Sequence, residues 1–357
     1  MTQISLLATL GLVLLASSSS AAAAGAGLAA PLSCGGAAGP SYAVWLDGAP
    51  LFTNPPPLAV FSGGAWQSGA WVAAGAANVT GTDSIGAFVG TECSYALAGA
   101  PSVVVFKAAA YTYASAAAAP TASVVRFRYE LPQGAAATNH SAGKGAAYST
   151  VANFPGFAGP ATPLPNVLTW RDAFFGPSND VRDTRGQVAS TAVFYGADVA
   201  ARVVALSPLD QFLNTALGDD LGAGAACADA GDAGCWVAGA SATVTSLPPA
   251  FAHNFALVAD TGFSRAVDSW GRVMRARYAG TADQRLDDLS LNTIGYQTDN
   301  GAQLCFGCQG PLDACLLEEK AYLDSVGMPI GYLSFQNDWR VALHTPHPHP
   351  HPTPLPS

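Results

Sequence analysis

Residues Ser123–Tyr129 read SVVRFRY, and this alternation is the strongest indication of the fold. Apolar side chains at every second position give a strand one buried face, while the arginines between them keep the other face in water. Similar short runs, separated by clusters of Gly, Pro, Asn and Asp, recur at Tyr42–Leu46, Ser102–Phe106, Thr191–Tyr195 and Arg202–Ala205. The pattern predicts a mainly β fold over residues 41–257, namely a β-sandwich or an enlarged, supersandwich-like module. Two smaller β domains divided near Pro160–Pro165 are the alternative.

The pattern changes after residue 257. Apolar side chains recur at helical spacing from Phe263 to Met274, which predicts a linker helix and a polar link in residues 258–288. Residues 289–343 then predict a strand, a loop, a helix and a second strand, at Leu289–Gln297, Pro311–Val326 and Pro329–Phe335 for the three regular elements. This order is typical of a βαβ unit, whose strands pair in parallel.

A (β/α)8 barrel takes roughly 250 residues, many more than follow Leu289. We therefore expect the βαβ unit to be the first part of an incomplete, TIM-barrel-like domain and the chain to be a truncated form. Residues 344–357 read HTPHPHPHPTPLPS, which predicts an extended, disordered tail. The alternating histidines of this tail could bind Zn²⁺ loosely, but we expect no dedicated metal site.

The N-terminus has the pattern of a secretory leader. An apolar run at Ile4–Ala16, too short to cross a bilayer, is followed by small residues, which predicts a signal peptide in residues 1–30. No later run is long enough for a membrane helix, so we expect no membrane association after cleavage. Seven cysteines and two glycosylation sequons, at Asn78 and Asn139, also fit an oxidising compartment. The sequence thus predicts a secreted, extracellular or luminal protein.

Charge and motifs exclude several classes of function. Charged residues make up 11% of the chain and the net charge is −9, whereas nucleic-acid binding needs clustered Lys and Arg. We find no glycine-rich phosphate loop after a strand and no recognisable Ser/His/Asp hydrolase order, and we expect no cofactor. His253 lies in an apolar run, which favours a hydrogen-bonded core histidine over a general base.

The cysteines predict structural disulfides. Cys227 and Cys235 flank a loop of small residues and are candidates for a local bridge. Cys305 and Cys308 form a CxxC that, with Cys315, could be a redox pair or part of a metal site. No fourth metal ligand lies nearby, and thiols in the secretory route usually become structural bridges, so these five residues are disulfide candidates. Unpaired thiols are the alternative, since one of seven cysteines must be left over.

Polar side chains follow both strands of the predicted βαβ unit. Asp299 and Asn300 come after the first strand, and Asp338 and Trp339 come after the second. Ligands bind at the carboxyl ends of parallel strands. Carboxylates can accept hydrogen bonds from sugar hydroxyls, and an aromatic ring offers a flat apolar face to a sugar ring. The alternative is that Asp299 belongs only to a turn and Asp338 only to the surface.

Six short motifs point towards one family. They are GTDSIG at Gly81–Gly86, NFPGF at Asn153–Phe157, SPLDQF at Ser207–Phe212, FALV at Phe255–Val258, IGYQTDNGA at Ile294–Ala302 and MPIGYL at Met328–Leu333. Together they resemble secreted glycoside hydrolase-like proteins related to the α-galactosidase and raffinose-synthase clan, in which a β-sandwich precedes a (β/α)8 barrel. The resemblance implies α-linked glycosides as substrates and a two-carboxylate displacement at the anomeric carbon.

The chain departs from this family at important positions. Gln297 stands where the family usually has an aromatic residue, and Gln336–Trp339 matches the family's Asp-rich motif imperfectly. The family's nucleophile and acid/base lie on later strands, so the resemblance implies no catalytic residue here and makes Asp299, Asn300, Asp338 and Trp339 substrate-binding. The sequence thus predicts a glycoside hydrolase-like protein that acts on or binds carbohydrate. The alternative is a non-catalytic carbohydrate-binding or structural extracellular β-sandwich protein.

Overall fold

The structure is a computed structural model of the chain. It describes residues 27–35, 37–52, 57–68, 71–99, 103–140, 150–158, 164–171, 174–178, 191–198, 200–219, 235–280, 287–298 and 312–335. The chain divides into two compact units, Met1–Tyr278 and Ala279–Ser357. Each unit is described by itself.

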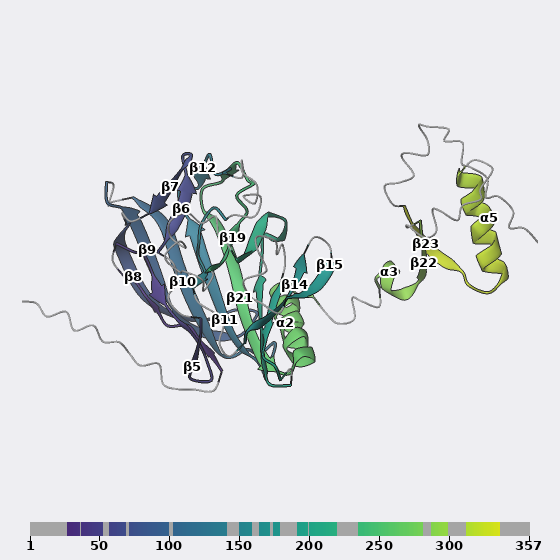
Figure 1. Cartoon of the computed structure of the whole chain (residues 1–357), viewed down its shortest axis with the longest axis horizontal. Helices are drawn as coiled ribbons and strands as arrows, with labels where there is room; N and C mark the ends of the chain where they lie inside the picture. Colours follow the sequence, from purple (N-terminus) through teal and green to yellow (C-terminus); the bar gives the residue numbers. More distant parts are fainter. Residues whose placement is uncertain are drawn as a thin grey trace, which may run out of the picture. The chain divides into compact units, whose positions relative to one another are not determined.

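The first unit is built on a nine-stranded antiparallel sheet (Figure 1). From one edge to the other its strands are β15 (Phe174–Ser178), β14 (Asn166–Arg171), β16 (Ala192–Tyr195), β17 (Arg202–Pro208), β21 (Phe251–Thr261), β11 (Ser123–Leu131), β10 (Val104–Ser115), β9 (Ala87–Leu97) and β8 (Trp71–Thr82). Strands from both sides of Pro160–Pro165 belong to this one sheet. The alternative of two smaller β domains is therefore wrong.

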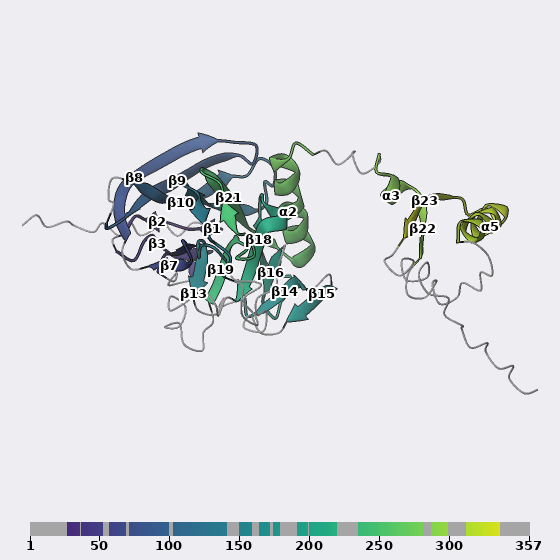
Figure 2. The same ribbon diagram turned by 90° about the horizontal axis from the view of Figure 1, so that it is seen from above.

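Smaller sheets pack against one face of the large sheet (Figure 2). They are formed by β1 (Leu28–Ala29), β4 (Val44–Leu46) and β5 (Ala49–Phe52); β2 (Leu32–Ser33) and β3 (Ser41–Tyr42); β6 (Ala59–Ser62) and β7 (Ala65–Ser68); β12 (Ala135–Ala136) and β20 (Ser246–Leu247); and β13 (Gly156–Ala158), β19 (Cys235–Ala240) and β18 (Thr215–Asp219), the last preceded by the short 3-10 helix η3 (Phe212–Asn214). The main hydrophobic core lies between the large sheet and these layers. The prediction of a mainly β fold is confirmed.

The alternation in β11 has the expected consequence. Val125, Phe127 and Tyr129 are fully buried in the main core, whereas Arg126 and Arg128 on the opposite face are partly exposed. Since successive side chains of a strand point to opposite faces, this one segment defines the inner and outer faces of the sheet.

Helix α2 (Phe263–Arg277) covers part of the outer face, beside β17 and β21 (Figure 1). Its Ala266 and Val273 are completely buried, and Val273 packs with Ala256 and Val258 of β21. Because both faces of β21 are covered, this strand is buried along nearly its whole length, and its apolar run Phe255–Ala259 does not alternate. The segment predicted as a linker helix is therefore an integral part of the first unit, and the boundary between the units lies after Tyr278.

The fold begins earlier than predicted. Residues 31–40 contribute β2, and β1 lies inside the segment 1–30 that was predicted as a leader. Leu28 is 4% exposed, and its amide nitrogen donates to Ser123 Oγ of β11. The amide of Gly27 donates to Asp47 Oδ1 at 2.7 Å. Residues Gly27–Ala29, within the segment predicted as a leader, are therefore part of the folded first unit.

The second unit contains a parallel strand pair. Its described elements are α3 (Leu289–Asn292), β22 (Ile294–Thr298), α5 (Leu312–Ser325) and β23 (Ile330–Phe335), and β22 pairs with β23 in parallel. The predicted helix and second strand are confirmed within a residue or two. The predicted start of the first strand at Leu289 is wrong, because Asp288 caps a short helix there by accepting from the amides of Ser290 and Leu291. The described residues contain two strands of this unit, and a barrel is not shown.

Among the described residues, no helix combines the length and the apolar character needed to span a membrane.

Candidate functional site

The carboxyl ends of β22 and β23 lie at the same edge of their sheet. Gln297 is opposite Ser334 and Thr298 is opposite Phe335 in the parallel register. The chain therefore leaves both strands from neighbouring positions, as a ligand site at strand ends requires. The four predicted substrate-binding residues, Asp299, Asn300, Asp338 and Trp339, follow these ends in sequence and lie outside the described residues.

An Ile-Gly-Tyr triplet occurs in each of the two strands, at Ile294–Tyr296 and at Ile330–Tyr332. A Cβ atom on Gly295 would lie 2.1 Å from Cζ of the Tyr332 ring, so this ring occupies the space that the glycine leaves. A Cβ atom on Gly331 would likewise lie 2.5 Å from Thr293 Oγ1. The two glycines thus hold the strand pair in close contact and position its carboxyl edge.

Tyr296 of β22 is affected electrostatically by α5. Burial raises the pKa of its hydroxyl, and the negative charge of Glu319 on α5 raises it further. The phenol therefore stays protonated at neutral pH and can donate a hydrogen bond.

In the first unit, the motifs GTDSIG, NFPGF and SPLDQF have structural roles in turns and loops. Asp83 of GTDSIG closes the turn between β8 and β9 by accepting from the amides of Ile85 and Gly86. The same carboxylate accepts from Tyr113 Oη at 2.8 Å and from Arg126 Nη1 at 2.9 Å. All of these contacts hold the turn against the outer face of the sheet. We therefore assign Asp83 a structural role and not a catalytic one.

Arg126 is the centre of a polar and aromatic cluster on this outer face. Its guanidinium carbon lies 4.3 Å from the ring centroid of Tyr111, a cation–π distance. Tyr111 in turn donates its hydroxyl to Glu92 at 2.7 Å. Burial raises the pKa of Tyr111 to about 12, and its hydrogen bond to Glu92 acts in the same direction. The Tyr111 hydroxyl and Arg126 Nη1 are paired, and although Arg126 Nε has no hydrogen-bond partner within the described residues, the guanidinium is packed against aromatic rings, which indicates a structural cluster.

The NFPGF motif packs on the inner face of the large sheet. Asn153 accepts from the amide of Ala59 and donates to the carbonyl of Pro57, both at 2.7 Å. Phe154 and Phe157 pack around Tyr42 in the main core, and the peptide bond between Phe154 and Pro155 is cis. This motif therefore fixes a buried loop.

The SPLDQF motif contributes Asp210, which fixes β21. Its carboxylate accepts from both the backbone amide and the side-chain amide of Asn254, at 2.9 and 2.6 Å. Burial raises the pKa of this carboxyl group, although both hydrogen bonds oppose the shift.

His253 is a core histidine, as predicted. It is 0% exposed, with Nε2 3.1 Å from Thr215 Oγ1 and 3.2 Å from the carbonyl oxygen of Asp210. Burial lowers its pKa to about 3, so the ring is neutral at physiological pH. Because none of the ring is exposed in the described part of the chain, a substrate cannot reach it there.

A hollow of about 270 Å³ lies beside α2. Asp260 is at its floor, but the carboxylate already accepts from Thr121 Oγ1, Ser269 Oγ and the amide of Thr261. Burial opposes ionisation of Asp260, yet these hydrogen bonds keep its pKa below the usual value. A fully paired carboxylate of this kind ties α2 to the sheet.

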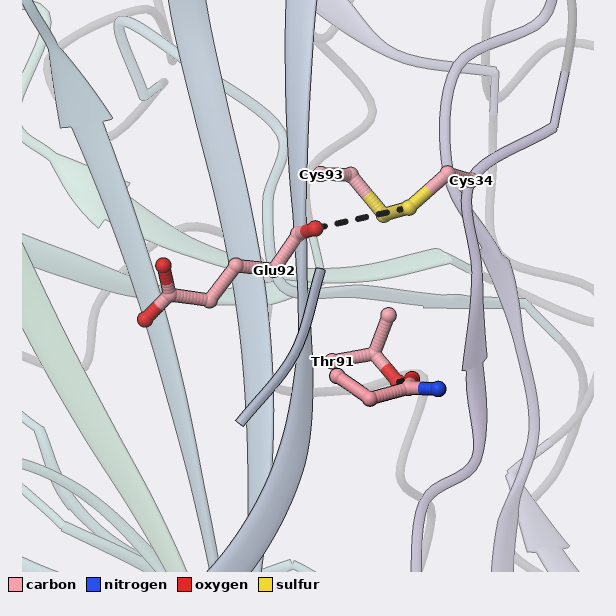
Figure 3. Close-up of a disulfide and its surroundings, with 5 residues drawn as sticks. Cys34, Thr91, Glu92 and Cys93 are labelled. Atoms are coloured by element: carbon pink, nitrogen blue, oxygen red, sulfur yellow. Dashed lines mark hydrogen bonds between the residues drawn. A yellow bond between two sulfur atoms is a disulfide. The ribbon is translucent and has the colours of Figure 1, made fainter. Parts of the chain in front are cut away.

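One disulfide, between Cys34 and Cys93, lies within the described residues (Figure 3). Its Cα atoms are 5.3 Å apart, and Cys34 Sγ lies 3.6 Å from the carbonyl oxygen of Glu92. The sequence analysis missed this pair, because 59 positions separate its members. The one available indication is that Cys93 and Tyr95 share the inward face of β9.

The five predicted bridge residues are not tested by the structure. Cys227, Cys305 and Cys308 lie outside the described residues, and although Cys235 begins β19 and Cys315 lies in α5, their side chains are not described. Within the described part of the chain, no three His, Cys, Asp or Glu side chains come together in an arrangement that could hold a metal ion.

The two predicted glycosylation sequons lie at different kinds of position. Asn78 is an exposed residue in β8, at the edge of the large sheet. Asn139 is also exposed and lies in a loop after β12, while its partner residue Ser141 is outside the described range.

Comparisons with known proteins give a partial likeness. No family model and no curated protein matches the sequence. Similar solved structures include a β-arabinopyranosidase, at 15% identity over 66% of this chain and 38% of that chain, with a TM-score of 0.38. A glycoside hydrolase family 97 enzyme from Pseudoalteromonas sp. strain K8 is similar in its complexes with panose and acarbose, at 12% identity over 76% of this chain and 39% of that chain, with TM-scores of 0.42 and 0.40.

This chain therefore spans about two fifths of the length of those enzymes. TM-scores below 0.5 establish neither a shared fold nor a shared activity, so the functional interpretation depends on the residues themselves.

Proposed function

We propose that this is an exported, glycoside hydrolase-like protein that binds α-linked glycosides at the carboxyl ends of β22 and β23. The observation that supports this proposal most directly is the parallel register of the two strands, with Thr298 opposite Phe335. Because of this register, the segments that follow β22 and β23 begin at adjacent positions. These segments carry Asp299, Asn300, Asp338 and Trp339. Export is a further prediction, which the leader-like N-terminus and the Cys34–Cys93 disulfide support.

The four residues suit sugar recognition by their chemistry. Carboxylates and an amide can accept and donate several hydrogen bonds to adjacent hydroxyls. Trp339 would supply an apolar face for the C–H surface of a sugar ring, as aromatic residues do when one side of a ligand is apolar. The resemblance to the α-galactosidase and raffinose-synthase clan assigns these positions to substrate binding and the nucleophile and acid/base to later strands. In this proposal Asp299 and Asp338 bind, and neither is catalytic.

Titration of the full chain with α-linked di- and trisaccharides, such as melibiose, raffinose and panose, tests the proposal. Calorimetry measures the affinity, and the difference in tryptophan fluorescence between the wild type and Trp339→Ala isolates the signal of Trp339 among the seven tryptophans. We expect Asp299→Asn, Asp338→Asn and Trp339→Ala each to weaken binding about tenfold or more, corresponding to about 1.4 kcal/mol. Asp287→Asn is the matched control, since it removes a carboxylate from the link before α3.

The alternative, in which the β-sandwich alone binds carbohydrate or serves as a structural module, gives a different result. Affinity that is unchanged in the Asp299, Asp338 and Trp339 triple variant would place the site in the first unit. No binding of any α-linked glycoside by the unmodified chain would overturn the proposal.

A further inference from the structure

The outermost strand of the large sheet has an unusually bare edge. β8 (Trp71–Thr82) pairs with β9 on one side, and no strand of the described residues pairs with its other side. It contains neither a charged residue nor a proline. Its one register shift lies between Ala73 and Gly75, so Gly75–Thr82 forms a regular ladder with β9. Exposed edges of this type can pair with another chain, and natural proteins usually block them.

Asn78 lies in the middle of this regular stretch. It is exposed and stands opposite Thr91 of β9. Thr91 Oγ1 donates to Asn78 Oδ1 at 3.2 Å, which fixes the orientation of the amide. Within the described part of the chain, the Nδ2 group of Asn78 donates to no acceptor. Asn78 and Thr80 are two residues apart, so they lie on the same face of the strand, as the Asn-Val-Thr sequon places them.

A groove of about 290 Å³ lies beside this amide. The segment Ala30–Leu32 forms one wall, while Thr91, Thr112 and Val89 belong to the sheet side. The groove contains no charged side chain, and Val89 is 53% exposed although it is apolar. Hydroxyl groups beside an exposed apolar side chain are suited to a neutral, amphipathic ring such as N-acetylglucosamine.

We propose that Asn78 carries an N-linked glycan, whose first N-acetylglucosamine occupies this groove and whose remaining sugars block the edge of β8. The Cys34–Cys93 disulfide, which joins β9 beside this strand, is consistent with an oxidising compartment, where such glycans are added. This inference does not depend on the sugar-binding site proposed for the second unit.

The modification requires a lipid-pyrophosphate-linked oligosaccharide as co-reactant. Asn78 Nδ2 forms a bond to the anomeric carbon of the first sugar and loses one proton, while the bond from that carbon to the phosphate oxygen breaks and the lipid pyrophosphate leaves. Oxidation states do not change in this transfer.

Expression of the full chain in a eukaryotic secretory host tests the first half of the proposal. Mass spectrometry of the peptide that contains Asn78 should show an N-linked glycan, and Asn78→Gln and Thr80→Ala should each remove it. An unmodified Asn78 peptide in the secreted protein would overturn the proposal.

Sedimentation of the same proteins tests the second half. We expect the wild type to stay monomeric, and Asn78→Gln and Thr80→Ala to form dimers or larger assemblies at the same concentration. Asn139→Gln is the matched control, because it removes the other sequon without affecting the edge.

A charged side chain on the edge of β8 should prevent association when the glycan is absent. Ala77 is exposed and stands opposite Glu92 of β9, so a lysine there would have a partner. The Asn78→Gln, Ala77→Lys double variant should therefore return to the monomer. If Asn78→Gln is monomeric, or if its association persists with Ala77→Lys, the glycan does not protect this edge.

Discussion

Cys34 and Cys93 join the end of β2 to the middle of β9 through a disulfide that closes a 59-residue separation. Replacing both with Ala should destabilise the first unit by about 4 kcal/mol, since a bridge over such a loop restricts the unfolded chain. Guanidinium denaturation followed by circular dichroism measures this effect. Reductant should lower the denaturation midpoint of the wild type more than that of the double variant, and an equal midpoint for both proteins without reductant would contradict the prediction.

The buried ring of His253 should make stability depend on pH. Its folded pKa is about 3, below the usual value near 6.5, so only the unfolded state binds this proton between those two values. Stability should therefore fall as the pH falls below about 6.5, by up to about 1.4 kcal/mol per pH unit. Denaturation midpoints at pH 7.5 and 4.5 should differ more in the wild type than in His253→Gln.

The pH dependence of the wild type must be compared with that of His253→Gln, because Asp210 also titrates. Burial raises its pKa, which lets the folded state take up a proton earlier and gives a pH dependence of the opposite sign. Because His253 Nε2 lies 3.9 Å from Asp210 Oδ1, the difference between the two proteins reports the contribution of His253 together with its effect on Asp210. An identical pH dependence for the wild type and His253→Gln would show that His253 does not contribute.

Two glycines in neighbouring strands should respond differently to Ala. A Cβ atom on Gly90 of β9 would lie 2.3 Å from the carbonyl oxygen of Ala110, a backbone atom that cannot move aside easily. We expect Gly90→Ala to cost about 1–3 kcal/mol or more, as overpacking does. Gly75→Ala in β8 is the control, because its nearest neighbour would be 3.9 Å away. Thermal unfolding of both variants measures the difference, and equal midpoints would refute it.

Binding without turnover is expected at the strand-end site. The resemblance assigns both catalytic carboxylates to strands after β23, and glycoside hydrolysis by this mechanism needs two of them. The full chain should therefore release no nitrophenol from nitrophenyl α-galactoside above the rate in buffer. Turnover that Asp299→Asn or Asp338→Asn abolishes would show that the binding assignment is wrong.

Local patterns in the sequence predicted much of the fold. The alternation of Val125 and Phe127 with Arg126 specified the two faces of β11, because burial follows the two-residue period of a strand. Helix α5 was predicted from Pro311, which suits a first helical turn, and from Gly327, which suits a C-cap. The helical period also located α2, but a period does not show what a helix packs against, so the sequence did not reveal that Val273 is buried on β21.

Long-range relationships were not predictable in this way. The pairing of Cys34 with Cys93 and the inclusion of β1 in the core depend on contacts between segments far apart in the sequence. The start of β22 was missed because the cap formed by Asp288 overrides the strand-like composition that follows it. In the candidate site, Thr298 and Phe335 lie opposite each other, as the predicted βαβ unit required. The roles of Asp299 and Asp338 stay predictions.

The position of β21 has a consequence for biosynthesis. This strand lies between β17 and β11 in the sheet, yet it is the last of the nine to leave the ribosome. Until residues 251–261 emerge, the half-sheets β8–β11 and β14–β17 lack the strand that joins them, and each has an unpaired inner edge. Because such non-local pairings form slowly, the nascent chain should need protection by chaperones until β21 inserts. Synthesis therefore controls when this sheet can close.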